Sequence, residues 1–332
     1  MMFMITLISG LLITISSNSW LSAWMGLEIN LLSFIPIMSY SSNIFTTEVS
    51  LKYFLIQALA SSSLLFIILS MSLLDSMFSM LNSSLTSIVV VTPLLMKVGA
   101  APVHWWFPSV SEGLSWENCF ILMMIQKIAP LMLISHIIYL NSFLAFYIVM
   151  SVLVGTVGGY NQVSIRKMLS YSFINHLAWM LVPIMMNQNI WLMYFLFYST
   201  LTLAIIYIIK PFQISFINQT FLINNNTKII KFLLFTSLLS LEGLPPFLGF
   251  FPKWIVIQSM ITNSSIILIT VMVILSLMTL YYYLRISYST FIILNLEPNW
   301  IQLGSLKIKK SLVFIMMVFS MTGLIFCPML IF

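Results

Sequence analysis

The chain has 332 residues, of which 61% are hydrophobic and only 6% are charged. Soluble domains carry roughly 25% charged residues, so this composition excludes an ordinary soluble protein and indicates one embedded in a membrane. The formal charge of +6 comes mainly from loops between apolar segments. We therefore interpret it as a sign of membrane topology and of contact with anionic lipid headgroups, and we expect no nucleic-acid partner.

Long apolar segments follow one another along almost the whole chain. A membrane-spanning helix needs about 20 mostly apolar residues. On this basis the sequence predicts an all-α polytopic membrane protein with about eleven transmembrane helices, the ninth of which is long and interrupted. In chain order the predicted helices cover residues 2–19, 20–39, 47–73, 84–103, 116–138, 142–160, 167–186, 189–209, 228–260, 264–286 and 311–331.

The basic residues of the loops predict the orientation of these helices. With eleven helices, the Lys- and Arg-containing connections at 160–167, 210–231 and 285–310 fall on the same side as the N-terminus. The opposite loops contain no Lys or Arg and one acidic residue, Asp75. The positive-inside rule therefore predicts an N-terminus on the cytoplasm-equivalent side and a C-terminus on the other side.

A short motif occurs twice in the chain. Residues 99–108 and 243–252 both read G-x-x-P-x-x-x-x-F-P. Gly and Pro at this density interrupt a helix, and in hydrocarbon the freed backbone groups need protein or water as partners. We interpret the two segments as paired broken helices of a duplicated unit of about five helices. A chance similarity between two loops rich in Gly, Pro and Phe is the alternative.

An odd number of helices in each unit inverts the second unit relative to the first, and paired broken helices of this kind mark the transport sites of secondary transporters. The predicted organisation is a single antiporter-like transmembrane domain over residues 1–332. Its first five-helix repeat covers residues 1–140 and its second covers 141–290, and residues 291–332 form a connecting loop and a C-terminal helix.

Four charged residues, Glu28, Lys97, Lys127 and Lys253, lie inside the predicted helices. A charged residue at the centre of a membrane helix costs about 2.5–3.5 kcal/mol on insertion scales, so each is a functional candidate. A lysine near a helix end can reach the interface, but Lys127 lies roughly 16 Å from either end of its helix. Glu28 needs a cationic partner, for which Lys97 is favoured. A small change in their separation would decide whether the lysine keeps its proton, so we predict proton movement.

Three weaker candidates for additional proton relays are His104, His176 and Glu242. His104 lies in the first broken segment, and a hydrogen-bonded interface histidine is an equal alternative for it. His176 lies in the middle of a predicted helix. Glu242 directly precedes the second broken segment and is either a further proton site or a counter-charge for Lys253.

No motif in the chain indicates a bound metal or cofactor. Cys119 and Cys327 share no motif typical of a disulfide, metal or iron–sulfur site. No Gly-rich nucleotide-binding loop is present in the sequence either. We therefore expect the chain to work without a cofactor of its own.

Several segments of the chain together resemble one known family. They are 24–30 (WMGLEIN), 47–54 (TEVSLKYF), 97–108 (KVGAAPVHWWFP), 126–130 (QKIAP), 161–167 (NQVSIRK), 174–179 (INHLAW) and 243–254 (GLPPFLGFFPKW). In this combination they resemble the antiporter-like subunits of respiratory complex I, in the shortened form encoded by animal mitochondria, with a composition that suits an insect. The resemblance covers about residues 18 to 290.

The resemblance implies a core subunit of the membrane arm that carries protons as part of a proton-translocating NADH:ubiquinone reductase. In such subunits a Glu beside a Lys, a central Lys and a distal Lys or Glu form the proton path, and Glu28, Lys97, Lys127 and Lys253 occupy those positions. One departure is Glu242, where the family usually has Gly before Gly-Leu-Pro-Pro.

The resemblance also implies surroundings for the chain. FMN, iron–sulfur clusters and ubiquinone would be bound elsewhere in the complex. The expected partners are other membrane-arm core subunits, accessory subunits and phospholipids, including cardiolipin. The expected location is the mitochondrial inner membrane, crossed many times, with the N-terminus on the matrix side and the C-terminus on the intermembrane-space side.

Two other functions use the same residues. The chain could belong to a cation/proton antiporter that is driven by ion gradients, or it could be a purely structural subunit whose buried charges hold the helices together. The missing redox motifs indicate only that the chain is no redox catalyst by itself.

Overall fold

The computed structural model describes residues 2–39, 43–73, 83–137, 142–186, 190–221, 228–262 and 265–288. Within these ranges the regular structure is helical, apart from one isolated antiparallel bridge between Ser164 and Phe216. The predicted last helix at 311–331, together with Cys327 and Asp75, lies outside the described residues.

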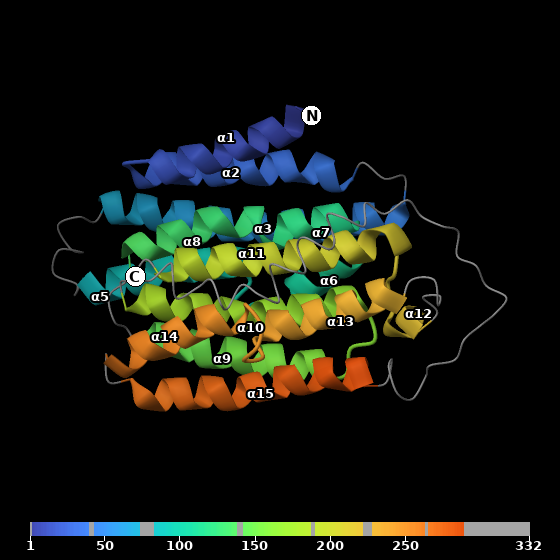
Figure 1. Ribbon diagram of the computed structural model, residues 1–332. Coiled ribbons are helices and arrows are strands. Elements are labelled where there is room, and N and C mark those ends of the chain that lie inside the picture. The colour runs from blue at the N-terminus through green and yellow to red at the C-terminus, as the bar shows by residue number, and fades with distance from the viewer. Residues whose placement is uncertain are drawn as a thin grey trace. The chain divides into compact units, whose positions relative to one another are not determined.

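The chain divides into two compact units, residues 1–151 with 184–187 and residues 152–183 with 188–332 (Figure 1). The first unit contains α1 (Met2–Ser16), α2 (Trp20–Met38), α3 (Ile44–Leu73), α5 (Ser83–Val98), α6 (Trp106–Gly113), α7 (Trp116–Met123), α8 (Ile125–Ile137) and the first half of α9 (Ser142–Tyr160). The second contains the rest of α9, α10 (Ile165–Met185, except its last residues), α11 (Ile190–Ile209), the short 3₁₀ helix η1 (Lys210–Phe212), α12 (Ile217–Phe221), α13 (Lys228–Glu242), α14 (Phe250–Thr262) and α15 (Ile266–Tyr288).

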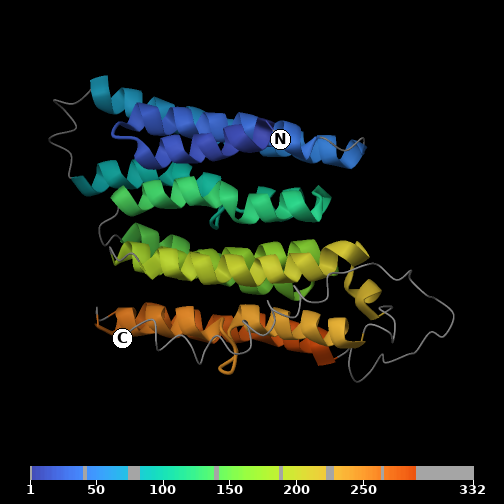
Figure 2. The ribbon, with the colours of Figure 1, turned by 45° about the horizontal axis from the view of Figure 1, so that its top comes forward.

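Packing inside each unit follows a simple order. In the first unit α1 packs along α2, α2 packs against α3, and α5 contacts both α3 and α8. Figure 2 shows α1 and α2 side by side, as Figure 1 does. In the second unit α11 and α15 both pack against α13 and α14. The helices that carry the predicted charges are therefore neighbours within each unit.

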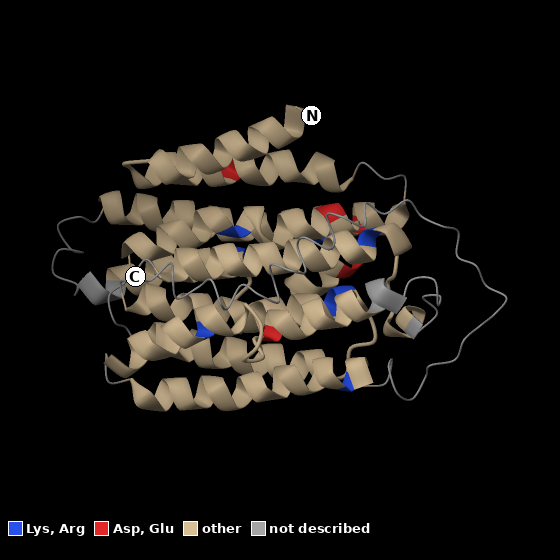
Figure 3. Ribbon diagram, viewed as in Figure 1, with Lys and Arg blue, Asp and Glu red and all other residues tan. Residues whose placement is uncertain are grey.

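The described helices carry few charged residues, and Figure 3 shows them as a few coloured positions on otherwise tan helices. Seven described stretches are long and apolar enough to cross a membrane: Trp20–Met38, Ile44–Leu73, Trp116–Ile137, Ser142–Tyr160, Ile165–Met185, Ile190–Phe212 and Ile266–Tyr288. Three shorter apolar helices accompany them in the described part of the chain. The all-helical membrane fold is therefore confirmed, whereas eleven spanning helices and an inverted repeat remain predictions.

Both copies of the Gly-Pro motif begin where a helix ends. Helix α5 ends at Val98, earlier than the predicted residue 103, and Gly99 follows with φ 80°. Helix α13 ends at Glu242, and Gly243 follows, also with φ 80°. This left-handed conformation favours glycine and is common directly after a helix, because the chain turns there without a Cβ clash. The predicted break within residues 228–260 is thus present, as the gap between α13 and α14.

A third interruption was not expected from the sequence. The predicted helix at 116–138 is divided at Met124 into α7 and α8, and the Lys127 N–H donates to the Met124 carbonyl oxygen at 3.0 Å, an i to i−3 bond. Pro130 in α8 has no N–H to donate, and its ring crowds the carbonyl of residue 126. The backbone irregularity therefore lies within one turn of the central lysine.

Gly249→Ala is expected to lower the thermal stability of the full chain more than Gly99→Ala does. A Cβ at Gly99 meets only side chains, the nearest at 3.3 Å, so the main cost there is the left-handed backbone, about 1 kcal/mol. A Cβ at Gly249 would overlap the backbone carbonyl oxygen of Ser240 and force the loop to move. The midpoints of thermal unfolding in detergent would measure this difference. Equal midpoints for the two variants would contradict the close approach of Gly249 to the Ser240 carbonyl oxygen.

Candidate functional site

Lys127 on α8 is buried with only 1% of its surface exposed. Its Nζ donates to the backbone carbonyl oxygens of Val98 at 2.7 Å and Lys97 at 3.3 Å. These are the last two residues of α5, whose carbonyls have no N–H partner further along the helix and carry its partial negative charge. The faces of the Trp106 and Phe107 rings lie 4.6 Å from the same Nζ, a distance that favours a cation. The end of α5 and the start of α6 therefore provide the carbonyl oxygens and aromatic rings around a buried ammonium group.

Lys97 and Lys127 line the same small cavity in the first unit. Its volume of about 20 Å³ has room for roughly one water molecule. The Tyr53 hydroxyl donates to Gln126 Oε1 at 3.3 Å, and Gln57 Nε2 donates to the Lys97 carbonyl oxygen at 3.4 Å. Asn30 and Trp106 also line the cavity. The two lysines therefore share a cavity with room for roughly one water molecule and with several polar side chains around it.

Glu28 lies on α2 and is partly exposed. It interacts electrostatically with Lys97, yet within the described part of the chain no side-chain nitrogen–oxygen distance between these two residues is 4.0 Å or less. The favoured partnership of Glu28 and Lys97 is therefore a longer-range interaction in this conformation. Their role as a switching pair remains a prediction.

Lys253 on α14 repeats the arrangement of Lys127 in the second unit. Its Nζ donates to the backbone carbonyl oxygen of Glu242, the last residue of α13, at 2.7 Å. The ring of Trp179 lies 5.5 Å from this Nζ. In both units a buried lysine is thus bound to the carbonyl end of a helix that stops at a left-handed glycine, Gly99 in one case and Gly243 in the other.

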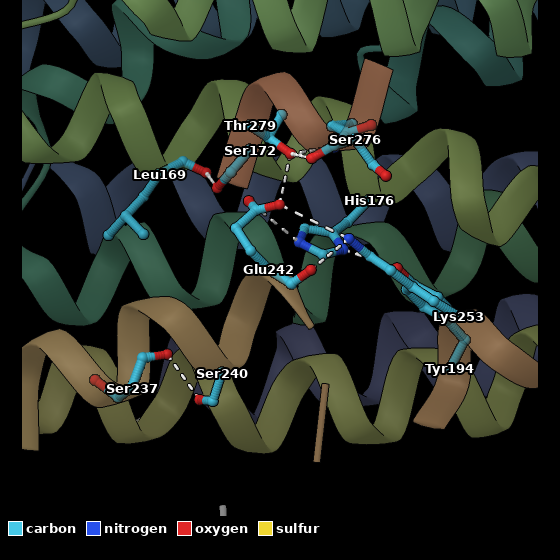
Figure 4. Close-up of polar contacts among 11 residues, drawn as sticks. Leu169, Ser172, His176, Tyr194, Ser237, Ser240, Glu242, Lys253, Ser276 and Thr279 are labelled. Carbon is cyan, nitrogen blue, oxygen red and sulfur yellow. Dashed lines mark hydrogen bonds and ion pairs between the residues drawn. The ribbon is translucent and has the colours of Figure 1, made fainter. Parts of the chain in front are cut away.

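A carboxylate distinguishes the second cluster from the first (Figure 4). The Glu242 side chain is completely buried, and its Oε2 lies 3.7 Å from Lys253 Nζ and accepts a hydrogen bond from Thr279 Oγ1 at 2.6 Å. His176 Nε2 lies 4.0 Å from Glu242 Oε1. His176 Nδ1 and the Tyr194 hydroxyl are hydrogen-bonded at 2.8 Å. Five helices of the second unit, α10, α11, α13, α14 and α15, therefore contribute to one connected polar cluster.

The structure sorts the sequence candidates into groups. Lys97 and Lys127 share a cavity, and His176, Glu242 and Lys253 form a cluster. His104 Nδ1 contacts the carbonyl oxygen of Pro102 at 3.1 Å, and His104 does not line the cavity of the two lysines.

Several polar partners were not identified from the sequence. Gln57 and Gln126 are uncharged but polar residues inside apolar helices, and that contrast was a usable signal. Tyr53 lies in segment 47–54, which contributes to the resemblance, but nothing there indicates a partner for its hydroxyl. Tyr194 and Thr279 lie in apolar stretches that also contain other Tyr, Thr or Ser residues, and nothing in the sequence distinguishes them. Only the three-dimensional fold brings them to the lysines and to Glu242.

Comparison with known proteins gives a consistent result. Residues 17–279 match the family described as NADH:quinone oxidoreductase/Mrp antiporter, transmembrane. NADH-ubiquinone oxidoreductase chain 2 of Anopheles gambiae is 49% identical over 330 residues, which are 99% of this chain and 96% of that protein. The protein of the same name from Locusta migratoria is 45% identical over 94% of this chain and 91% of that protein.

Solved structures share the fold at lower identity. A chain of respiratory complex I from Thermus thermophilus with bound aureothin superposes with a TM-score of 0.81 at 20% identity, over 98% of this chain and 78% of that chain. A chain of the Mrp complex from Dietzia sp. DQ12-45-1b gives a TM-score of 0.75 at 17% identity, over 87% of this chain and 59% of that chain. At these identities the similarity concerns the fold.

Thr279→Val is expected to destabilise the full chain, whereas Thr279→Ser is not. Valine keeps the shape of the side chain but removes the hydroxyl that donates to the buried Glu242 carboxylate, and losing a hydrogen bond to a charged group costs about 1.5–3 kcal/mol. Thermal unfolding of the three proteins in the same detergent measures the effect. A Val variant as stable as the wild type would show that the carboxylate does not depend on this donor.

Proposed function

Because this chain belongs to the NADH:quinone oxidoreductase/Mrp antiporter transmembrane family, we propose that its two lysine clusters carry protons across the membrane. The chain is an antiporter-like subunit of the membrane arm of respiratory complex I. In this proposal NADH oxidation and quinone reduction take place in other subunits, where FMN, iron–sulfur clusters and ubiquinone are bound. This chain contributes the proton path.

The observation that carries the proposal is the placement of a buried lysine at the carbonyl end of each broken helix. A carbonyl oxygen stabilises an ammonium group through its dipole without a full opposite charge. When such a lysine loses its proton, the groups left around it are neutral carbonyls, which other donors can bind. If a carboxylate were its sole partner, loss of the proton would leave the negative charge of that carboxylate buried and unpaired. The arrangement therefore suits a group that changes its charge during turnover.

Each candidate residue has a role in the proposed path. Glu28 and Lys97 form the switching pair, and Lys127 is the central relay, which exchanges its proton with Lys97 through the shared cavity. Lys253 is the distal station. Glu242 is its counter-charge, and His176 is an additional relay beside it. His104, at the first break, is the remaining candidate relay.

We propose the location and partners that follow from the same family. The chain crosses the mitochondrial inner membrane with its N-terminus in the matrix, as the basic loops indicate. Its neighbours are other core and accessory subunits of complex I and phospholipids, including cardiolipin.

Lys127→Met, made at the matching position of a bacterial relative, is expected to lower proton pumping and coupled quinone reduction by at least about tenfold. The loss of a positioned proton-transfer group usually costs about 10²–10⁴-fold, part of which a water bypass would restore. The measurement is proton uptake and quinone reduction by the whole complex in sealed vesicles.

The matched control is Lys52→Met. Lys52 is exposed and forms an i, i+4 ion pair with Glu48 at 2.6 Å, so its loss should leave pumping unchanged. Wild-type pumping by the Lys127 variant would favour the structural role for the buried charges. Gradient-driven cation/proton exchange by the isolated wild-type chain would instead favour an antiporter.

Glu242→Gln and Lys253→Met are expected to destabilise the chain strongly as single changes and less than additively together. Removal of one partner of a buried ion pair leaves the other unpaired, at a cost of about 3–5 kcal/mol, whereas the double change removes both charges. Thermal unfolding of the four proteins gives the coupling. Additive effects would mean that Glu242 is not the counter-charge of Lys253.

A further inference from the structure

Two hollows of different character meet at Arg285, in the last turn of α15. One is a cavity of about 310 Å³ whose lining is about half polar, called the polar cavity below, and the other is a groove of about 620 Å³ whose lining is mostly apolar. Both lie within the second unit, and Arg285 lines both. Neither takes part in the lysine clusters described above.

The polar cavity is built from four parts of the second unit. The end of α9 and the loop after it line one part of the cavity, α10 contributes Met168, α12 contributes Asn218, and α15 contributes Tyr282 and Arg285. The bridge between Ser164 and Phe216 ties the loop to the segment before α12. The amide-bearing residues in its lining are Asn161, Gln162 and Asn218.

Arg285 is positioned for an anion. Its guanidinium lies 5.9 Å from the ring of Tyr160, and among the described residues it forms no ion pair. Tyr282, whose hydroxyl is buried, also lines the cavity. A guanidinium presents a planar pair of donors that matches a phosphate group, and side-chain amides add further donors.

The apolar groove begins on the other side of Arg285. Phe232 and Leu239 of α13 and Tyr281, Leu284 and Tyr288 of α15 line it. Tyr281 stacks on Tyr160 of the polar cavity with ring centroids 6.0 Å apart, so the aromatic pair joins the two hollows. A groove of this composition on a membrane helix pair suits an acyl chain.

We propose that an anionic phospholipid binds here, with its phosphate in the polar cavity against Arg285 and an acyl chain in the groove between α13 and α15. Charge and shape both favour this occupant, because a phosphate next to an acyl chain matches a polar cavity next to an apolar groove. The site lies on the side of the chain that carries the basic loops, where anionic headgroups are attracted. The proposal does not depend on proton transfer.

The test compares lipid retention by the full chain in detergent. The purified chain is mixed with equal amounts of phosphatidylglycerol and phosphatidylcholine, and native mass spectrometry counts the bound lipids. We expect the wild type to retain phosphatidylglycerol about fivefold over phosphatidylcholine, and Arg285→Gln to bring that ratio close to one, because a charge-assisted pair to phosphate is lost. Leu239→Trp, which fills the groove without changing the charge, should lower the retention of phosphatidylglycerol.

Lys210→Gln is the matched control. Lys210 is an exposed cation of η1 in the same unit, and it lines neither hollow. Its variant should keep the wild-type preference. Equal loss of preference in both variants would assign the effect to general surface charge and overturn the proposal, as would an unchanged preference in Arg285→Gln.

Two further outcomes decide between occupants. Inorganic phosphate should not displace the bound phosphatidylglycerol, and full displacement would identify a free-anion site and overturn the lipid assignment. If the wild type retains neither lipid, protein covers the groove and the proposal fails. Should Arg285→Gln aggregate, Leu239→Trp alone still tests the site, because its unchanged retention of phosphatidylglycerol would exclude the groove.

Discussion

In a membrane interior an ammonium group and an unpaired backbone carbonyl are both costly, and placing one against the other offsets both costs. The bond from Lys127 to the end of α5 and the bond from Lys253 to the end of α13 are two instances of this arrangement. Each bond needs a helix that stops inside the membrane, and Gly99 and Gly243 provide the stop. The broken helices and the buried lysines therefore satisfy each other's polar groups.

The two clusters differ in the charge that faces the lysine. Lys127 is surrounded by carbonyl oxygens, the rings of Trp106 and Phe107, and a cavity that it shares with Lys97. Lys253 has in addition the buried carboxylate of Glu242, which Thr279 supports. The lysine of the second cluster therefore faces a buried carboxylate in addition to a carbonyl oxygen.

The sequence was most informative where polarity contrasts with its surroundings. The sequence showed the lysines in apolar helices, the repeated Gly-Pro motif and the acid at position 242. One of the two roles considered for Glu242 was a counter-charge for Lys253, and the fold does bring these two side chains together. The interruption at Met124 was not predicted, because Met124 lies among apolar residues with no Gly or Pro beside it. Thr279 and Tyr194 were missed for a similar reason, since a hydroxyl in a helix is ordinary until tertiary structure gives it a partner. Whether Glu28 pairs with Lys97 depends on the distance between their side chains, and the pattern of residues along the sequence does not give that distance.

Burial also determines which parts of the molecule respond to dissolved salt. At physiological ionic strength mobile ions screen exposed charges over about 8 Å, but they do not enter a packed interior. The lysine clusters are almost completely enclosed, so the interactions within them are insulated from the ions of the surrounding solution. Arg285 and the Glu48–Lys52 pair are exposed and respond to it. Salt therefore distinguishes two kinds of electrostatic interaction in this chain: it weakens those of exposed residues and has little effect on those between buried charges.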